Sequence, residues 1–129
     1  GLTPAINKNQ IIRAALESIA FQIKDYLVDL EVKNKIKYNE IYIDGGIVSN
    51  TSFMQFLTNI LNKKIYVTNY QDMSSYGALM MGLLGMNIKK NFKEIKKLKQ
   101  KYFIFTPSKD KEANQSYENW KLVLKKFYF

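Results

Sequence analysis

The sequence predicts an α/β fold that is rich in helix and contains two or three short strands. Long amphipathic segments alternate with short β-branched runs, which is the pattern of α/β proteins. The two clear strands, residues 41–43 and 65–67, are too few to complete a sheet, and the first helix has no strand before it. We therefore expect this chain of 129 residues to form the later part of a larger α/β domain.

The first helix is expected over residues 9–31, where apolar residues recur every three or four positions. Asn7 or Asn9 can cap its start. The polar stretch 33–39 ends this helix. The β-branched and aromatic run 41–43 then predicts a strand that stops at a pair of glycines.

The later elements are placed by the same signals. A helix with an apolar stripe from Phe53 to Leu61 is expected first, capped by Asn50, Thr51 or Ser52, and the strand 65–67 follows it. A third helix is capped by Ser74 or Ser75, and a fourth is expected over 92–99. A strand over 102–105, a turn at Pro107 and a last helix from about Glu112 complete the order. In the third helix, small residues mark where another element must pack closely: Gly77, Ala78 and Gly82. The buried side of the last helix is expected to carry Tyr117, Trp120, Leu124 and Phe127.

The composition excludes several chemistries. The chain contains no Cys and no His, so disulfides, thiolate metal sites and catalysis by Ser-His-Asp or Cys-His groups are ruled out. No apolar run approaches the roughly 20 residues of a membrane-spanning helix, and no leader precedes the first helix. We expect a cytoplasmic location. Because the chain opens on Gly1, we also expect that it starts within a gene or has been processed.

The net charge of +9 is concentrated in the last third of the chain. Residues 1–86 carry 8 basic and 7 acidic side chains, and residues 87–129 carry 12 and 4. One interpretation is a nucleic-acid-binding face. However, Lys outnumbers Arg 19 to 1, and specific phosphate and base contacts favour the guanidinium fork. We therefore interpret this charge as a solvated basic surface and expect no nucleic-acid partner.

The segment Asp44–Asn50 is the candidate functional motif. It follows a strand and precedes a helix, which is where ligands bind in open α/β folds. Gly45 and Gly46 permit a close approach to the main chain, and the Asn50 amide can both donate and accept hydrogen bonds. The alternative is a glycine turn with Asn50 as a helix cap and no ligand. The motif lacks the Gly-Lys-Ser/Thr of a P-loop.

Three blocks resemble the C-terminal domain of glycerol kinases, in the FGGY family of sugar kinases. The first is Asp44-Gly45-Gly46 with Asn50 and Met54-Gln55-Phe56, and the Met-Gln-Phe run is similar to glycerol kinases rather than pentulose kinases. The second block is Gly1-Leu2-Thr3 followed by the helix with Ala14-Ala15-Leu16-Glu17, and the third is Tyr76-Gly77-Ala78-Leu79 with Gly82. Thr58 and Asn59 depart from the Ala-Asp usual in the family.

This resemblance implies a partial actin-like ATPase fold (ribonuclease H-like), with residues 1–129 forming one C-terminal fragment of a sugar kinase. It implies ATP-dependent phosphorylation of glycerol to glycerol 3-phosphate. Gly46 and Asn50 match nucleotide-contacting positions, Gly45 belongs to the same turn, and Asp44 is expected to orient the loop.

In the family, the catalytic Asp, the polyol pocket and the Mg²⁺ ligands come from upstream sequence. We therefore expect no catalytic or metal-binding residue here, and an isolated chain that is inactive. A fragment of another carbohydrate kinase and a non-catalytic nucleotide-binding remnant stay open as alternatives, and a homo-oligomer is also compatible with the sequence.

Overall fold

The computed structural model describes residues 2–68, 72–98 and 101–128 of the chain. Its elements in order are α1 (Lys8–Asn34), β1 (Glu40–Ile43), the 3₁₀ turn η1 (Gly46–Ser49), α2 (Thr51–Leu61), β2 (Lys64–Thr68), α3 (Met73–Gly85), α4 (Phe92–Ile95), β3 (Tyr102–Phe105) and α5 (Lys111–Tyr128). The alternation of helices and strands confirms the α/β prediction. The expected helix 92–99 is shorter than predicted, and its last residue, Lys99, lies outside the described residues.

The described strands form one sheet in the order β1-β2-β3. β1 and β2 run parallel, with Ile41 opposite Ile65, and α2 connects them. β3 joins the other side of β2 in the antiparallel direction, with Phe105 opposite Ile65. The predicted strands 41–43, 65–67 and 102–105 are thus all present.

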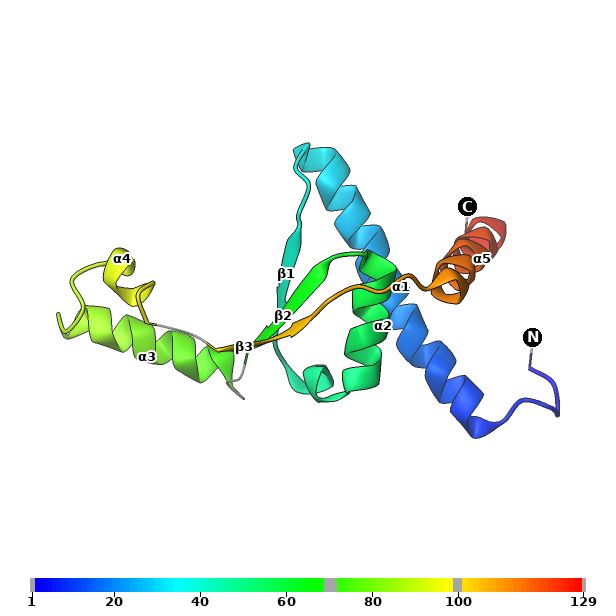
Figure 1. Ribbon diagram of the computed structural model, residues 1–129, viewed down its shortest axis with the longest axis horizontal. Helices are drawn as coiled ribbons and strands as arrows, with labels where there is room; N and C mark the ends of the chain where they lie inside the picture. Colours follow the sequence, from blue (N-terminus) through cyan, green and yellow to red (C-terminus); the bar gives the residue numbers. More distant parts are fainter. Residues whose placement is uncertain (1, 69–71, 99–100, 129) are drawn as a thin grey trace.

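One face of the sheet is covered by helices, and this face holds the core. α1 and α2 lie together on the same side of the sheet, and α5 packs beside them (Figure 1). The largest side chains that are completely or almost completely buried come from α2 and β2 and are Met54, Leu57, Thr58, Ile60 and Ile65. The hydroxyl of Thr58 donates to the Met54 carbonyl at 2.6 Å, so this buried polar group is satisfied.

The start of each long helix is set by a polar side chain. Asn7 caps α1 in a reciprocal arrangement with Gln10, whose side chain accepts from the Asn7 backbone N–H. The predicted cap Ser74 or Ser75 of α3 is wrong. Asp72 caps this helix because its carboxylate accepts both the Ser74 and Ser75 backbone N–H groups at 3.0 Å.

α5 is attached to α1 through aromatic side chains. The ring of Phe21 lies 5.8 Å from Tyr117 and 5.6 Å from Trp120, measured between centroids. The Tyr117 hydroxyl donates to Asp25, and the burial and this carboxylate together raise the pKa of Tyr117. Phe127, expected on the buried side of α5, is 69% exposed, so this prediction is wrong.

α3 and α4 extend away from the sheet (Figure 1). No residue of α3 is buried. The predicted close packing at Gly77 and Gly82 is absent from the described part of this chain, since a Cβ at either position would meet nothing within 4 Å.

Two clusters of polar side chains form hydrogen bonds that hold the loops near the sheet. Asn59 Oδ1 accepts hydrogen bonds from Gln55 and from both the backbone N–H and the hydroxyl of Ser108. The departure from the family at Asn59 is thus accommodated. Just beyond the same, carboxyl end of α2, the ammonium of Lys63 lies 2.8 Å from Glu31 Oε1 and donates to the Tyr38 carbonyl at 2.7 Å.

Candidate functional site

The segment Asp44–Asn50 lies where β1 ends and α2 begins. Gly45 has φ +105° and ψ 176°, a conformation that L side chains rarely adopt. Gly46 has no positive φ that would exclude another residue, and a Cβ at Gly46 would meet nothing within 4 Å. Gly45 is therefore required by the backbone, whereas the space over Gly46 is open to a ligand or another part of the protein.

Asn50 takes the role of helix cap that was considered from the sequence and keeps its amide donor exposed. Its Oδ1 accepts the Phe53 backbone N–H at 3.0 Å, so Asn50 is the cap of α2. Among the described residues, its Nδ2 has no hydrogen-bond partner. The side chain is exposed, so Nδ2 is available to donate to a bound molecule.

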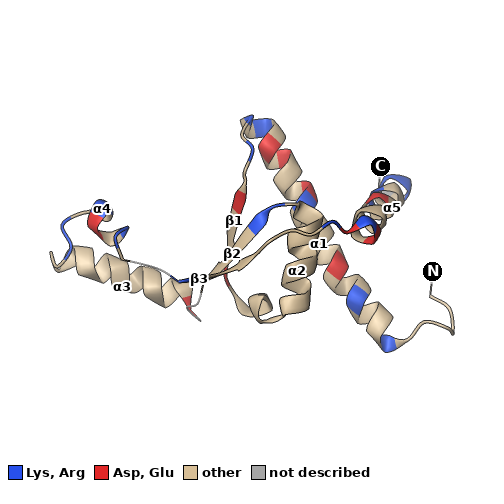
Figure 2. Cartoon of the chain, viewed as in Figure 1, with Lys and Arg blue, Asp and Glu red and all other residues tan. Residues whose placement is uncertain are grey.

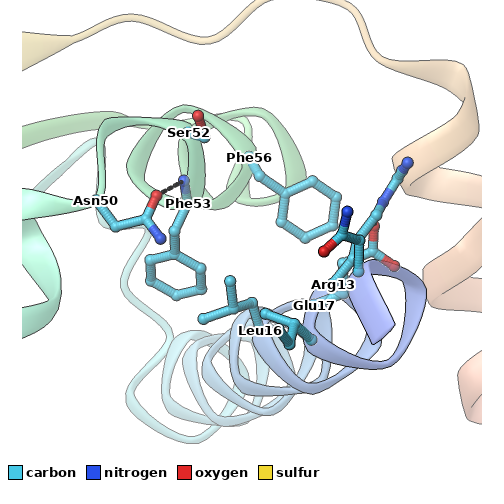
Figure 3. Close-up of a pocket in the computed structure, with 9 residues that line it drawn as sticks. Arg13, Leu16, Glu17, Asn50, Ser52, Phe53 and Phe56 are labelled. Atoms are coloured by element: carbon cyan, nitrogen blue, oxygen red, sulfur yellow. Dashed lines mark hydrogen bonds and ion pairs between the residues drawn. The ribbon is translucent and has the colours of Figure 1, made fainter. Parts of the chain in front are cut away.

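A pocket of about 370 Å³ opens beside Asn50, between the first turns of α1 and α2. Figure 3 shows Phe53, Phe56 and Leu16 forming its apolar walls, with Asn50 at one end and the pair Arg13–Glu17 at the other. Arg13 Nε lies 2.6 Å from Glu17 Oε1, and this contact raises the pKa of Arg13. Apolar walls with a few polar groups at the ends are typical of small-molecule sites.

Asp44 differs from its expected role. Among the described residues its carboxylate accepts no hydrogen bond, so it does not orient the loop through backbone N–H groups as predicted. Instead Asp44 lines a second pocket, of about 270 Å³, together with Tyr42, Tyr66 and Met73.

A cluster of tyrosines that was not predicted from the sequence lies on the face of the sheet opposite α1 and α2. The rings of Tyr42 and Tyr66 stack at 4.9 Å, and Tyr102 meets both edge-on. Glu40 accepts the hydroxyl of Tyr66 at 2.9 Å, and this carboxylate raises the pKa of Tyr66. The signal was present, because equivalent positions of neighbouring parallel strands place side chains on the same face.

The basic residues of the last third do not form a single face. Among the described residues, most of them lie in or close to α4 and α5, which are at opposite ends of the molecule (Figure 2). Within residues 2–68, 72–98 and 101–128, no three acidic side chains come close enough to hold a metal ion, and we assign no metal ligand there. No helix in these same ranges is long and apolar enough to cross a membrane.

Comparison with known proteins assigns this arrangement to a class of kinases. The family model for the FGGY family of carbohydrate kinases, C-terminal domain, matches residues 1–86. The chain belongs to this family, and its fold is part of the actin-like ATPase fold of these sugar kinases.

The similar proteins include several glycerol kinases. The chain is 38% identical over 124 residues to a glycerol kinase of Fusobacterium nucleatum, covering 93% of this chain and 24% of the relative. It is 36% identical over 127 residues to glycerol kinase 5 of Gallus gallus, covering 97% and 24%. A crystal structure of Plasmodium falciparum glycerol kinase with ADP matches 100% of the chain and 26% of that protein, with a TM-score of 0.82 and 28% identity. The chain thus spans about a quarter of the length of these relatives.

Proposed function

We propose that residues 1–129 form the nucleotide-binding side of an ATP-dependent glycerol kinase, which phosphorylates glycerol to glycerol 3-phosphate. In this proposal Gly45, Gly46 and Asn50 hold the adenosine end of ATP. The remainder of the kinase supplies the catalytic carboxylate, the polyol pocket and the Mg²⁺ ligands. The isolated chain is then inactive.

The observation that carries the proposal is the geometry of the loop after β1. Gly45 turns the chain, the main chain at Gly46 is left open, and the Asn50 Nδ2 is available beside an apolar pocket. An aromatic base fits apolar walls, and a ribose hydroxyl or a base edge fits an amide donor. The similarity to glycerol kinases, one of them solved with ADP, supports the choice of nucleotide and of glycerol.

The role of this chain in the reaction is to position the nucleotide. Phosphoryl transfer depends on alignment and on stabilisation of charge by several converging parts. Mg²⁺, when bound with ATP, neutralises charge on the phosphates, and in this proposal its ligands lie outside the chain. The loop holds the nucleoside in this proposal. Loss of a contact between the loop and the nucleoside therefore reduces the affinity for ATP and ADP and moves the phosphates out of alignment with the substrate.

The test uses a chimera in which this chain replaces the aligned segment of the Fusobacterium nucleatum glycerol kinase. Asn50→Ser retains a capping oxygen for α2 but removes the amide donor. We expect a roughly 3- to 10-fold weaker affinity for ADP by calorimetry, the loss of one hydrogen bond. Gly46→Ala is expected to weaken ADP binding by approximately 10-fold or more if the nucleotide contacts this main chain.

Gly85→Ala, at the far end of α3, is the matched control and should leave the affinity for ADP unchanged. The proposal for the loop fails if the Gly46→Ala and Asn50→Ser chimeras bind ADP as tightly as the parent. Glycerol phosphorylation by the chimera, compared with other polyols and sugars, tests the substrate. Nucleotide binding without any phosphorylation would favour the non-catalytic remnant.

A further inference from the structure

A small pocket lies beside the tyrosine cluster, at the carboxyl ends of β1 and β2. It has a volume of about 270 Å³, and its lining includes Asp44, Met73, Tyr42, Tyr66 and Tyr102. α3 starts at Met73 and extends away from the sheet (Figure 1), and Tyr42 and Tyr102 are 59% and 37% exposed. The pocket is therefore open to solvent and has room for a small organic ion, since one water molecule occupies about 30 Å³ in the liquid.

The strand register brings the three rings together. Tyr42 and Tyr66 are opposite each other on parallel strands and stack with 4.9 Å between their centroids. Tyr102, on β3, meets these two rings at 74° and 89°. Rings in two perpendicular orientations thus bound one small volume, so a group inside it can lie over the face of a ring. That face carries a negative potential and attracts a cation within roughly 6 Å of the centroid.

The two carboxylates near the rings have different roles. Glu40 accepts the Tyr66 hydroxyl at 2.9 Å and the Tyr42 hydroxyl at 3.4 Å, and a phenol that donates to a carboxylate has a more electron-rich ring. Lys64 is opposite Glu40 at the start of the strand pair and does not line the pocket. Asp44 is exposed and accepts no hydrogen bond among the described residues. It is the single charged side chain among the described residues that line the pocket, so one positive charge complements it.

The polar groups at the pocket favour a cation without N–H donors. A primary ammonium carries three N–H groups that each need an acceptor. Glu40 already accepts from two of the tyrosines, which leaves the Asp44 carboxylate as the charged acceptor at the pocket. A quaternary ammonium has no N–H and spreads its charge over alkyl groups that fit aromatic rings. We propose that the pocket formed by Tyr42, Tyr102 and Asp44 binds a small quaternary ammonium ion.

The test is calorimetric titration of the chimera described above with choline, whose head group is a quaternary ammonium. We expect a dissociation constant on the order of 1 mM, as a few contacts between a cation and exposed rings provide. Dimethylbutanol, in which carbon replaces the charged nitrogen, and methylammonium, a primary ammonium, should both bind at least about 5-fold more weakly. The isolated chain of 129 residues is titrated in parallel and carries the test if the chimera does not fold.

Two substitutions locate the site. Asp44→Asn and Tyr102→Leu should each weaken choline binding by roughly 5-fold or more, whereas Tyr102→Phe keeps the ring and should bind as the parent does. Tyr26→Leu is the matched control, because Tyr26 is 68% exposed on α1 and lies outside the pocket. A melting curve shows whether each variant is folded. If Tyr102→Leu does not fold, Asp44→Asn decides, since the exposed Asp44 makes no hydrogen bond among the described residues.

Four results would overturn the proposal. The first is equal affinity for choline and dimethylbutanol, or no binding of either. The second is an Asp44→Asn variant that binds choline as tightly as the parent. The third is binding to the isolated chain but not to a folded chimera, since the rest of a kinase would then fill the pocket. The fourth is co-sedimentation with phosphatidylcholine vesicles without binding of free choline, because the ligand would then be a lipid head group.

The cation site and the nucleotide site can be tested separately. Gly45, Gly46 and Asn50 do not line this pocket, so the cation site does not depend on nucleotide binding by the loop. A chimera that binds choline but not ADP would support the cation site and count only against the nucleotide site.

Discussion

Phe21 is the side chain on which the packing of three helices depends. It is 5% exposed, and its ring centroid lies 6.0 Å from Phe56 of α2 and within 6 Å of Tyr117 and Trp120 of α5. Phe21→Ala removes a buried ring that the surrounding aromatic groups cannot replace. We expect a loss of about 3–5 kcal/mol in the free energy of unfolding. That is at least about a fifth of the roughly 5–15 kcal/mol typical of a domain.

The assay is urea unfolding followed by far-ultraviolet circular dichroism and by the fluorescence of Trp120. The urea concentration at the midpoint of unfolding should fall by roughly 2 M for a domain of this size. Trp120 contacts Phe21, so its emission should change even before unfolding. Phe92→Ala is the matched control, because Phe92 is 65% exposed and its loss should change the free energy by less than about 0.5 kcal/mol. A cost below about 1 kcal/mol for Phe21→Ala would refute this account of the core.

Three further predictions concern the loop and the ion pair at the end of α1. Lys63 holds the pKa of the Glu31 carboxylate below its ordinary value of 4.5. The stability that this ion pair gives the fold is therefore present above pH 4.5 and is lost as the pH falls through the lowered pKa. Glu31→Gln should flatten the acid side of a plot of unfolding free energy against pH. Gly45→Ala should lower the free energy of unfolding, measured by chemical denaturation, by about 1–3 kcal/mol because Gly45 has a positive φ. Gly46→Ala should lower it by less than about 0.5 kcal/mol, and equal losses would contradict the assigned roles. Asn50→Ala should cost about 1 kcal/mol and Asn50→Ser much less, as thermal unfolding can measure.

The local structure was predictable from the sequence because its signals are local. Apolar spacing located α1 and α2, β-branched runs located β1 and β2, and Asn7 and Asn50 were among the named caps. The cap of α3 was misassigned because the serines are its hydrogen-bond donors, not its acceptor.

Long-range features were harder to predict. The small residues Gly77 and Gly82 predicted close packing that the described residues do not provide, since spacing carries no information about what lies opposite. The tyrosine cluster depends on the register between β1 and β2, which no single segment encodes. At the candidate site, the sequence located Gly45, Gly46 and Asn50 between a strand and a helix, and only the backbone angles distinguish Gly45, with its positive φ, from Gly46.

The sheet order has a consequence for how the chain folds as it is synthesised. β1, α2 and β2 are consecutive and pair with each other, so this unit can form as soon as residues 40–68 are free of the ribosome. β3 and α5 belong to the 61 residues that follow, which take roughly 3–12 s to synthesise. During that interval β2 has an open edge and Phe21 lacks Tyr117 and Trp120. The candidate loop is therefore the early product of folding, and the aromatic packing of α5 is the last step that secures it.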